Sequence, residues 1–296
     1  MSGDKLTKRL KLRFVTLCVG EDFFNAVKKG MRDACDLMNA ESSFVGTEDI
    51  DLPEQVRLVE EAIRSGVDGI ALNLAHSDAF NDVIRKSTEA GIPVVAFNID
   101  ASNGNAGNLG SVCQDLFQAG KSLGQRAASD IETGSKILAT THSDGISALE
   151  SRLKGIREAL SPKNLSYKVL TTGMVSGIAA EKILAEIEKD PSVRAVLCTG
   201  QADTEGAGLA IARLPAARRP YVAGFDLSPE ILRLIKDGVI SFTIDQQPYL
   251  QGFLPVVQLV LNVRYGIRPA SVDAGATIID RNSVDSVIEL SRAGYR

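Results

Sequence analysis

Residues 62–74, AIRSGVDGIALNL, decide the fold of this chain. They contain the end of a helical pattern, a short polar turn and an apolar run of strand length. Residues 187–199, IEKDPSVRAVLCT, repeat the same order in the second half. Both apolar runs are continuous rather than alternating, which is typical of strands that helices cover on both faces. The two stretches therefore predict two similar α/β halves.

The same alternation extends along the whole chain. Short apolar runs are separated by longer segments with apolar residues at helical spacing, as in 53–65, where Val56, Val59 and Ile63 share one stripe. The predicted strands are 12–19, 69–74, 93–98, 136–141, 168–172, 195–199, 221–225 and 241–245. The predicted helices are 23–38, 53–65, 79–90, 116–131, 148–160, 178–189, 204–212, 229–237 and 249–264. This β-α-β order predicts parallel sheets flanked by helices, with right-handed crossovers.

Two segments lack this pattern. Residues 102–110, SNGNAGNLG, contain three glycines and are predicted to form a flexible connection leaving the first half. Residues 264–280, with Pro269 and Gly275, are predicted to be a loop-like tail. Gly91 and Gly238 are expected to end helices.

Composition excludes several classes of protein. The 296 residues carry 33 Lys and Arg against 37 Asp and Glu, a net charge of −4, with 44% hydrophobic and 24% charged residues. These values are typical of a globular protein with a sizeable core. The mild acidity, the 5% aromatic content and the absence of Trp argue against a nucleic-acid-binding protein. We expect no nucleic-acid partner.

Cysteine and histidine usage argues against a metal site. The four cysteines, Cys18, Cys35, Cys113 and Cys198, form no C-x-x-C pair, and we expect them to be small buried apolar residues. Neither of the two histidines lies in an H-E-x-x-H motif. We therefore expect no metal and no cofactor.

The N-terminal segment is predicted to lead into a strand rather than to form a signal peptide. Its apolar run at residues 14–19 is too short, and no cleavage site of the A-x-A type follows. An exported protein would have lost its signal peptide before this chain begins. No run of about 18 apolar residues predicts a membrane span.

Catalytic motifs are incomplete. Gly120-Lys121-Ser122 ends like a phosphate-binding loop, but Asp115 stands where that motif needs glycine. Ile211 replaces the third glycine of a dinucleotide-binding pattern that begins at Gly206. Ser176 lies one residue too late for a nucleophile elbow. No catalytic residue is assigned. A sugar-modifying enzyme that uses Asp226 or Glu150 remains an alternative function.

Polar residues follow the predicted strands, where ligands meet open parallel sheets. Carboxylate and amide groups suit neighbouring hydroxyls, because they accept or donate to adjacent O–H groups. Phe23 and Phe24 could cover the apolar face of a sugar ring, or pack in the core. Asp22 and Asp226 could instead cap helices. The strand-end residues are Glu21, Asp22, Phe23, Phe24, Asn73, His76, Asn98, Asp100, His142, Ser143, Asp144, Gln201, Asp203, Asp226, Asp245, Gln246 and Gln247.

Six segments resemble the periplasmic sugar-binding proteins of the ribose-binding type, the solute receptors of ABC importers. These segments are 23–30, 66–70, 90–95, 224–226, 235–238 and 243–248. The resemblance covers about residues 10–290. It implies two lobes joined by three crossovers near 111–115, 243–247 and 272–278. The implied lobes are 1–113 plus 245–275, and 114–244 plus 276–296.

The resemblance also implies a function. A small sugar or polyol would bind in a cleft between the lobes, which close by hinge motion. The chain would be a periplasmic monomer that delivers its ligand to an ABC permease of the inner membrane. It would do no chemistry. A chemosensory receptor is a further alternative.

The family's binding residues map onto this chain one by one. The double aromatic falls on Phe23 and Phe24, the aspartate on Asp226 and the hinge glutamine on Gln246. Asn98 and Ile99 replace an acidic residue and an arginine. In the second lobe, Glu150 replaces an arginine, with Arg152 two residues on, and Ala202 replaces the asparagine before Asp203. These departures point to a pentose other than ribose, a hexose or a polyol. The excess of acid suits a ligand with an amine. The predicted binding residues are Glu21, Phe23, Phe24, Asn98, Asp100, His142, Glu150, Arg152, Gln201, Asp203, Asp226 and Gln246.

Overall fold

The computed structural model describes residues 7–101 and 104–296. Its chain divides into two compact units. Of the described residues, unit 1 contains those within 7–114, 247–274 and 295, and unit 2 contains those of 115–246, 275–294 and 296. Tyr295 is thus grouped with unit 1, whereas the sequence placed the whole tail in the second lobe.

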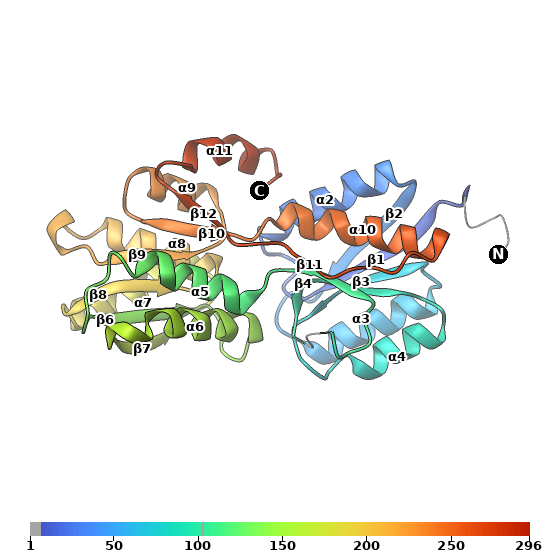
Figure 1. Ribbon diagram of the computed structural model, residues 1–296, viewed down its shortest axis with the longest axis horizontal. Coiled ribbons are helices and arrows are strands. Elements are labelled where there is room, and N and C mark those ends of the chain that lie inside the picture. The colour runs from blue at the N-terminus through green and yellow to red at the C-terminus, as the bar shows by residue number, and fades with distance from the viewer. Residues whose placement is uncertain (1–6, 102–103) are drawn as a thin grey trace. The chain divides into compact units, whose positions relative to one another are not determined.

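Unit 1 is a parallel sheet with helices on both faces (Figure 1). Within the described part of this sheet, called sheet 1, the strand order is β11-β5-β4-β3-β1-β2. The strands are β1 (Leu10–Thr16), β2 (Ala40–Gly46), β3 (Gly69–Leu74), β4 (Val94–Asp100), β5 (Gly110–Cys113) and β11 (Val272–Asp273). The helices are α2 (Phe24–Leu37), α3 (Leu52–Arg64), α4 (Asn81–Glu89) and α10 (Pro248–Tyr265). One apolar layer joins the sheet to α2 and α10, and a second joins it to α3 and α4.

Unit 2 repeats this plan with one difference. The strand order of its sheet, called sheet 2, is β12-β10-β9-β8-β6-β7, and the edge strand β12 pairs antiparallel with β10. The strands are β6 (Lys136–Thr141), β7 (Ser166–Thr171), β8 (Val193–Cys198), β9 (Tyr221–Phe225), β10 (Phe242–Asp245) and β12 (Thr277–Asp280). The helices are α5 (Leu116–Ala127), α6 (Ser147–Leu160), α7 (Ser176–Lys189), α8 (Gln201–Ala212), α9 (Pro229–Lys236) and α11 (Val284–Arg292). The predicted architecture of parallel sheets flanked by helices is confirmed, with β12 as an antiparallel edge strand.

Local sequence explains where many helices begin and end. Asp51 accepts a hydrogen bond from the Glu54 amide at 2.9 Å and starts α3, with Pro53 in the first turn. Ser228 does the same for α9 by accepting from the Ile231 amide at 3.0 Å. Gly91 and Gly238 follow α4 and α9 with positive φ, as predicted from the sequence.

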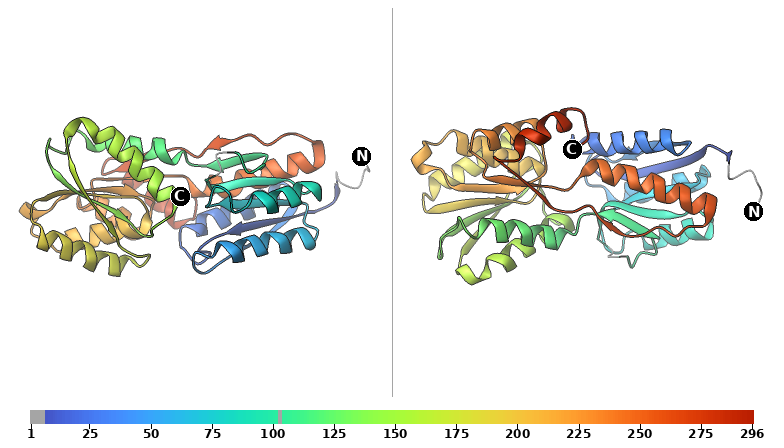
Figure 2. Two further views of the ribbon diagram at one scale, coloured as in Figure 1. Left: turned by 90° about the horizontal axis from the view of Figure 1, so that it is seen from below. Right: turned by 45° about the horizontal axis from the view of Figure 1, so that its top comes forward.

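Close glycine contacts bring pairs of helices together. A Cβ atom at Gly30 would overlap the carbonyl of Tyr249, and one at Gly252 would overlap the carbonyl of Val27. Helices α2 and α10 therefore pack backbone to backbone on one face of sheet 1. Gly120 and Gly155 bring α5 and α6 together in unit 2, where the two helices run side by side (Figure 2).

Several elements were not predicted. Strand β2 was missed because its sequence, AESSFVG, is mostly polar and its residues are only half-buried. The tail described as loop-like contains β11 and β12, and α11 follows it. Residues 102 and 103 of the predicted flexible connection lie outside the described residues. The rest of that segment leads into β5, which still belongs to sheet 1, so the chain leaves unit 1 only after Gln114.

Candidate functional site

Asp226 lies directly after β9, at the carboxyl end of sheet 2. Its backbone has φ +70°, its amide donates to the Ile244 carbonyl at 2.8 Å, and the Thr243 hydroxyl donates to its carbonyl at 2.8 Å. These bonds turn the side chain away from the regular strand direction. The cap that begins α9 is Ser228, so the alternative role of Asp226 as a helix cap is wrong.

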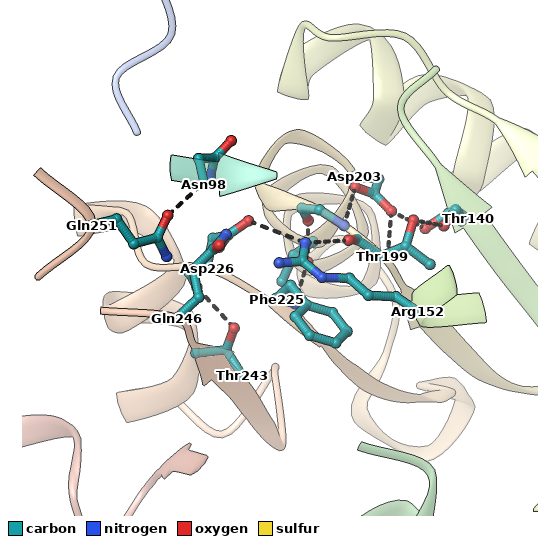
Figure 3. A network of polar contacts seen from close by, with 12 residues as sticks. Asn98, Thr140, Arg152, Thr199, Asp203, Phe225, Asp226, Thr243, Gln246 and Gln251 are labelled. Carbon is teal, nitrogen blue, oxygen red and sulfur yellow. Dashed lines mark hydrogen bonds and ion pairs between the residues drawn. The ribbon is translucent and has the colours of Figure 1, made fainter. Parts of the chain in front are cut away.

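Two side chains hold the Asp226 carboxylate (Figure 3). Gln246 donates from Nε2 to Oδ1 at 2.6 Å, and Nη1 of Arg152 lies 3.9 Å from Oδ2. Asp226 is 6% exposed. Burial raises the pKa of Asp226, while the Arg152 guanidinium and the Gln246 amide oppose that rise.

Arg152 reaches this carboxylate from α6. Its Nη1 donates to the Thr199 carbonyl at 2.9 Å, and the guanidinium lies over the Phe225 ring, 4.2 Å from the centroid. Burial lowers the pKa of Arg152, and the charges of Asp226 and Asp203 oppose that shift. A fixed guanidinium beside a fixed carboxylate offers both donors and acceptors to a polar ligand.

Asp203 was predicted to bind ligand, but the structure places it inside unit 2. It has no exposed surface and accepts from the Thr140 hydroxyl at 2.7 Å, the Thr199 amide at 2.9 Å and the Gly200 amide at 3.0 Å. Burial raises the pKa of Asp203 to about 7, against these hydrogen bonds. Its carboxylate therefore holds the start of α8, and its contact with a ligand stays a prediction.

The other predicted residues of unit 2 differ in their exposure. His142 is half-buried directly after β6, and its Nδ1 lies 3.0 Å from the Ser143 hydroxyl. Burial and the charge of Arg152 lower the pKa of His142 to about 4. Gln201 is half-buried at the start of α8. Glu150 is exposed in the first turn of α6. Arg152, rather than Glu150, is the residue of α6 that contacts the Asp226 carboxylate.

Asn98 is the centre of the corresponding polar group in unit 1. It lies in β4 with φ +63°, where the pairing of β3 with β4 shifts register. Asn98 accepts from Asn73 Nδ2 at 2.9 Å. It donates from its own Nδ2 to Gln251 Oε1 at 3.1 Å (Figure 3). Asn73 was noted among the strand-end residues, but Gln251 was missed because it lies in a helix.

A sequence signal for Gln251 existed. It interrupts the otherwise apolar start of α10, PYLQGFLPVVQLVL, and a buried polar side chain needs a partner. Sequence periodicity predicted the helix, but it could not show which strand this side chain faces.

The two predicted aromatics have different environments. Phe24 is 3% exposed and packs with Phe44 in the core layer under α2, whereas Phe23 is only partly buried. Phe24 is therefore a core residue, whereas Phe23 packs against the same layer with part of its ring exposed, and its contact with a ligand stays a prediction. Glu21 and Asp100 are half-buried, and Asp100 accepts from Asn108 Nδ2 at 3.2 Å. Helix α2 begins without a side-chain cap, so Asp22 does not cap it.

Metal clusters and membrane-spanning helices are absent from residues 7–101 and 104–296. No group of three or more His, Cys, Asp or Glu residues there could hold a metal ion. The four cysteines are buried and free. No helix within these ranges is long and apolar enough to cross a membrane.

Two α/β units with polar groups at the carboxyl ends of their sheets define the class of two-unit binding proteins. Residues 14–265 match the model of the periplasmic binding protein domain, and the chain belongs to this family. The family comprises binding proteins rather than enzymes, which removes the enzyme alternative.

Individual relatives include sugar-binding proteins. The chain is 28% identical to the xylose/arabinose-binding protein of Sulfolobus acidocaldarius, over 95% of this chain and 74% of that protein. It is 27% identical to the ribose import binding protein of Bacillus subtilis, over 86% and 81%. A carbohydrate transporter from Acidothermus cellulolyticus, solved in complex with myo-inositol, is 27% identical with a TM-score of 0.86, over 98% of this chain and all of that one.

Proposed function

We propose that this protein is the solute-binding receptor of an ABC importer and binds a small neutral sugar or polyol. The observation that carries this proposal is the buried group of Arg152, Asp226 and Gln246 at the end of β9. Burying an ion pair costs desolvation that an apolar pair of similar volume would avoid. A role in ligand recognition accounts for a buried ion pair at the carboxyl end of a sheet, which is where ligands bind open parallel sheets.

The Arg152–Asp226 pair favours a neutral ligand over one with an amine. Arg152 balances Asp226, so this group adds no net charge, and His142 is neutral at pH 7 because its pKa is about 4. The relatives bind xylose, arabinose and ribose by name, and one structure holds myo-inositol. A pentose or an inositol is therefore our first expectation, and an amino sugar the less favoured one.

A thermal-shift screen tests the proposal. The panel contains D-ribose, D-xylose, D-arabinose, D-glucose, myo-inositol and D-glucosamine. A ligand that binds only the folded state at 100 times its Kd stabilises it by about 2.7 kcal/mol, so the melting temperature rises measurably. A rise with a neutral compound, without loss of that compound on prolonged incubation, supports a receptor. No rise across the panel contradicts the proposal, and turnover of a sugar would return the enzyme alternative.

The transport partner and the cellular site are part of the same proposal. The relatives named as import binding proteins support a role outside the cytoplasmic membrane, where the liganded receptor docks on an ABC permease. We further propose that the receptor is a monomer. Light scattering in the presence and absence of a ligand from the panel should give the mass of one chain, and a dimer would contradict this point.

A further inference from the structure

Four polar side chains of unit 1 form an unbroken chain of hydrogen bonds across the ends of three strands. We call Thr16, Asn73, Asn98 and Gln251 the amide relay. Asn73 Nδ2 donates to Thr16 Oγ1 at 3.3 Å and to Asn98 Oδ1 at 2.9 Å, and Asn98 Nδ2 donates to Gln251 Oε1 at 3.1 Å. The strands β1, β3 and β4 are neighbours in sheet 1, and the relay ends on α10.

The direction of the relay follows from its first member. The Thr16 hydroxyl donates its hydrogen to the Leu17 carbonyl at 3.1 Å, so towards Asn73 it can only accept. Asn73 must therefore turn its nitrogen to Thr16 and Asn98. Asn98 must in turn present its oxygen to Asn73 and its nitrogen to Gln251. Reversing the amide of Asn98 would place oxygen against oxygen at Gln251, and nitrogen against nitrogen at Asn73.

Asn98 is the most exposed member of the relay. Thr16 and Gln251 have no exposed area, Asn73 is 2% exposed and Asn98 is 8% exposed. Asn98 also has a left-handed backbone at a register shift, so regular strand geometry does not set the direction of its side chain. The relay sets it instead. A bound hydroxyl that meets Asn98 finds an amide whose donor and acceptor sides cannot exchange.

We propose that Thr16, Asn73 and Gln251 are positioning residues that lock the amide of Asn98 in one orientation and thereby select among neutral polyols by their hydroxyl arrangement. This inference rests on the proposed function, because it assumes that Asn98 contacts the sugar. A hydroxyl that meets the wrong side of a locked amide leaves two groups unpaired, and the expected discrimination is about tenfold.

Substitutions at Thr16 test the relay without touching the ligand. Thr16→Val keeps the shape and removes the hydroxyl, whereas Thr16→Ser is the matched control that keeps it. Titration calorimetry against D-ribose, D-xylose, D-arabinose and myo-inositol is done well below the melting temperature of each variant. We expect Thr16→Val to change the affinity ratio of the two tightest compounds by at least about fivefold. Thr16→Ser should keep that ratio within about twofold. A folded Thr16→Val with wild-type ratios would overturn the inference.

Substitutions at Gln251 provide a second test if Thr16→Val does not fold. Gln251→Glu keeps an acceptor for Asn98 Nδ2, and Gln251→Met removes it. The ratio should change with Met and be retained with Glu. Equal ratios in the two variants would contradict the relay.

An NMR measurement separates failure of the relay from failure of the proposed function. If the wild type binds no compound of the six-compound thermal-shift panel, the proposed function fails, and the side-chain amide signals of Asn98 then decide the relay. Slow hydrogen exchange of these signals in the wild type, lost in Gln251→Met, supports a locked amide. Exchange at the same rate in both proteins overturns it.

Discussion

Removing the charge of Asp226 is the most direct test at the scale of single residues. Asp226→Asn should weaken sugar binding at least tenfold, about 1.4 kcal/mol, because a carboxylate accepts stronger hydrogen bonds than an amide. It should also lower the free energy of unfolding by about 3–5 kcal/mol, because Arg152 would stay buried beside a neutral partner. Calorimetric titration and urea unfolding measure the two effects. Wild-type affinity in the folded variant would exclude Asp226 from the site.

Alanine substitutions at the two neighbouring phenylalanines should have opposite effects on stability and on sugar binding. Phe24→Ala should lower the free energy of unfolding by about 3–5 kcal/mol, because Phe24 is buried in the core layer under α2. Phe23→Ala should cost less stability and weaken sugar binding, by about 0.5–1.5 kcal/mol if its ring faces the sugar. Each variant needs one urea titration and one binding titration. Reversed effects would show that the two rings had been assigned the wrong way round.

His142 should contribute a pH dependence to stability. Its pKa is about 4 in the folded protein against 6.5 for an ordinary histidine, so between these values the unfolded chain binds more protons. Stability from this group therefore rises with pH from about 4 to 6.5, by at most about 3.4 kcal/mol. Asp203 acts in the opposite direction, because its pKa of about 7 lies above its ordinary value and stability from it falls as pH rises from about 4 to 7.

Comparing the wild type with His142→Asn separates these two groups. The difference in the free energy of unfolding between the two proteins should shift in favour of the wild type as pH rises from 4 to 6.5. Urea unfolding at several pH values measures it, and the imidazole signals of His142 in NMR give its pKa directly. A constant difference across this range would show that His142 titrates normally when folded.

At the scale of elements, close packing of helices depends on glycine. Gly252→Ala would place a Cβ against the Val27 carbonyl and force α2 and α10 apart, at a cost of about 1–3 kcal/mol or more. Gly177→Ala is a matched control, because its Cβ would meet no atom within 4 Å and it lies in α7. Alanine has the higher helix propensity, so the control should be neutral or stabilising by up to about 1 kcal/mol. Urea unfolding of both variants checks the contrast.

The elements that sequence missed share a physical cause. Strand β2 is half-buried and mostly polar, so its pairing with β1 rather than its own composition makes it a strand. Strand β11 has two residues and exists because Val272 and Asp273 pair with Val112 and Cys113 of β5. Strands such as β3, β6 and β9 were predicted with their observed bounds, because continuous apolar runs mark strands buried on both faces.

At the scale of the whole molecule, each unit is assembled from separate pieces of chain. We propose that residues 7–114 fold only with 247–274, because α10 buries Val256, Leu259 and Val260 in the layer that covers one face of sheet 1. A chain of residues 7–114 alone should lack cooperative unfolding. The same chain joined through a flexible linker to 247–274 should unfold cooperatively in urea. Equal cooperativity in the two chains would contradict the proposed boundaries.

The sequence by itself determined the class of fold, the family and most of the helices and strands, because apolar periodicity and helix punctuation are local properties. It also identified Asp226, Gln246, Asn98 and Arg152 as candidate binding residues. Only the tertiary structure decided how these side chains are arranged.

The structure showed that Arg152, rather than Glu150, faces Asp226, and that Asp203 and Phe24 are buried inside their units. It also joined Gln251 to Asn98, 153 positions apart. The direction of a side chain depends on which elements pack around it, and such contacts between distant segments leave no local pattern in the sequence.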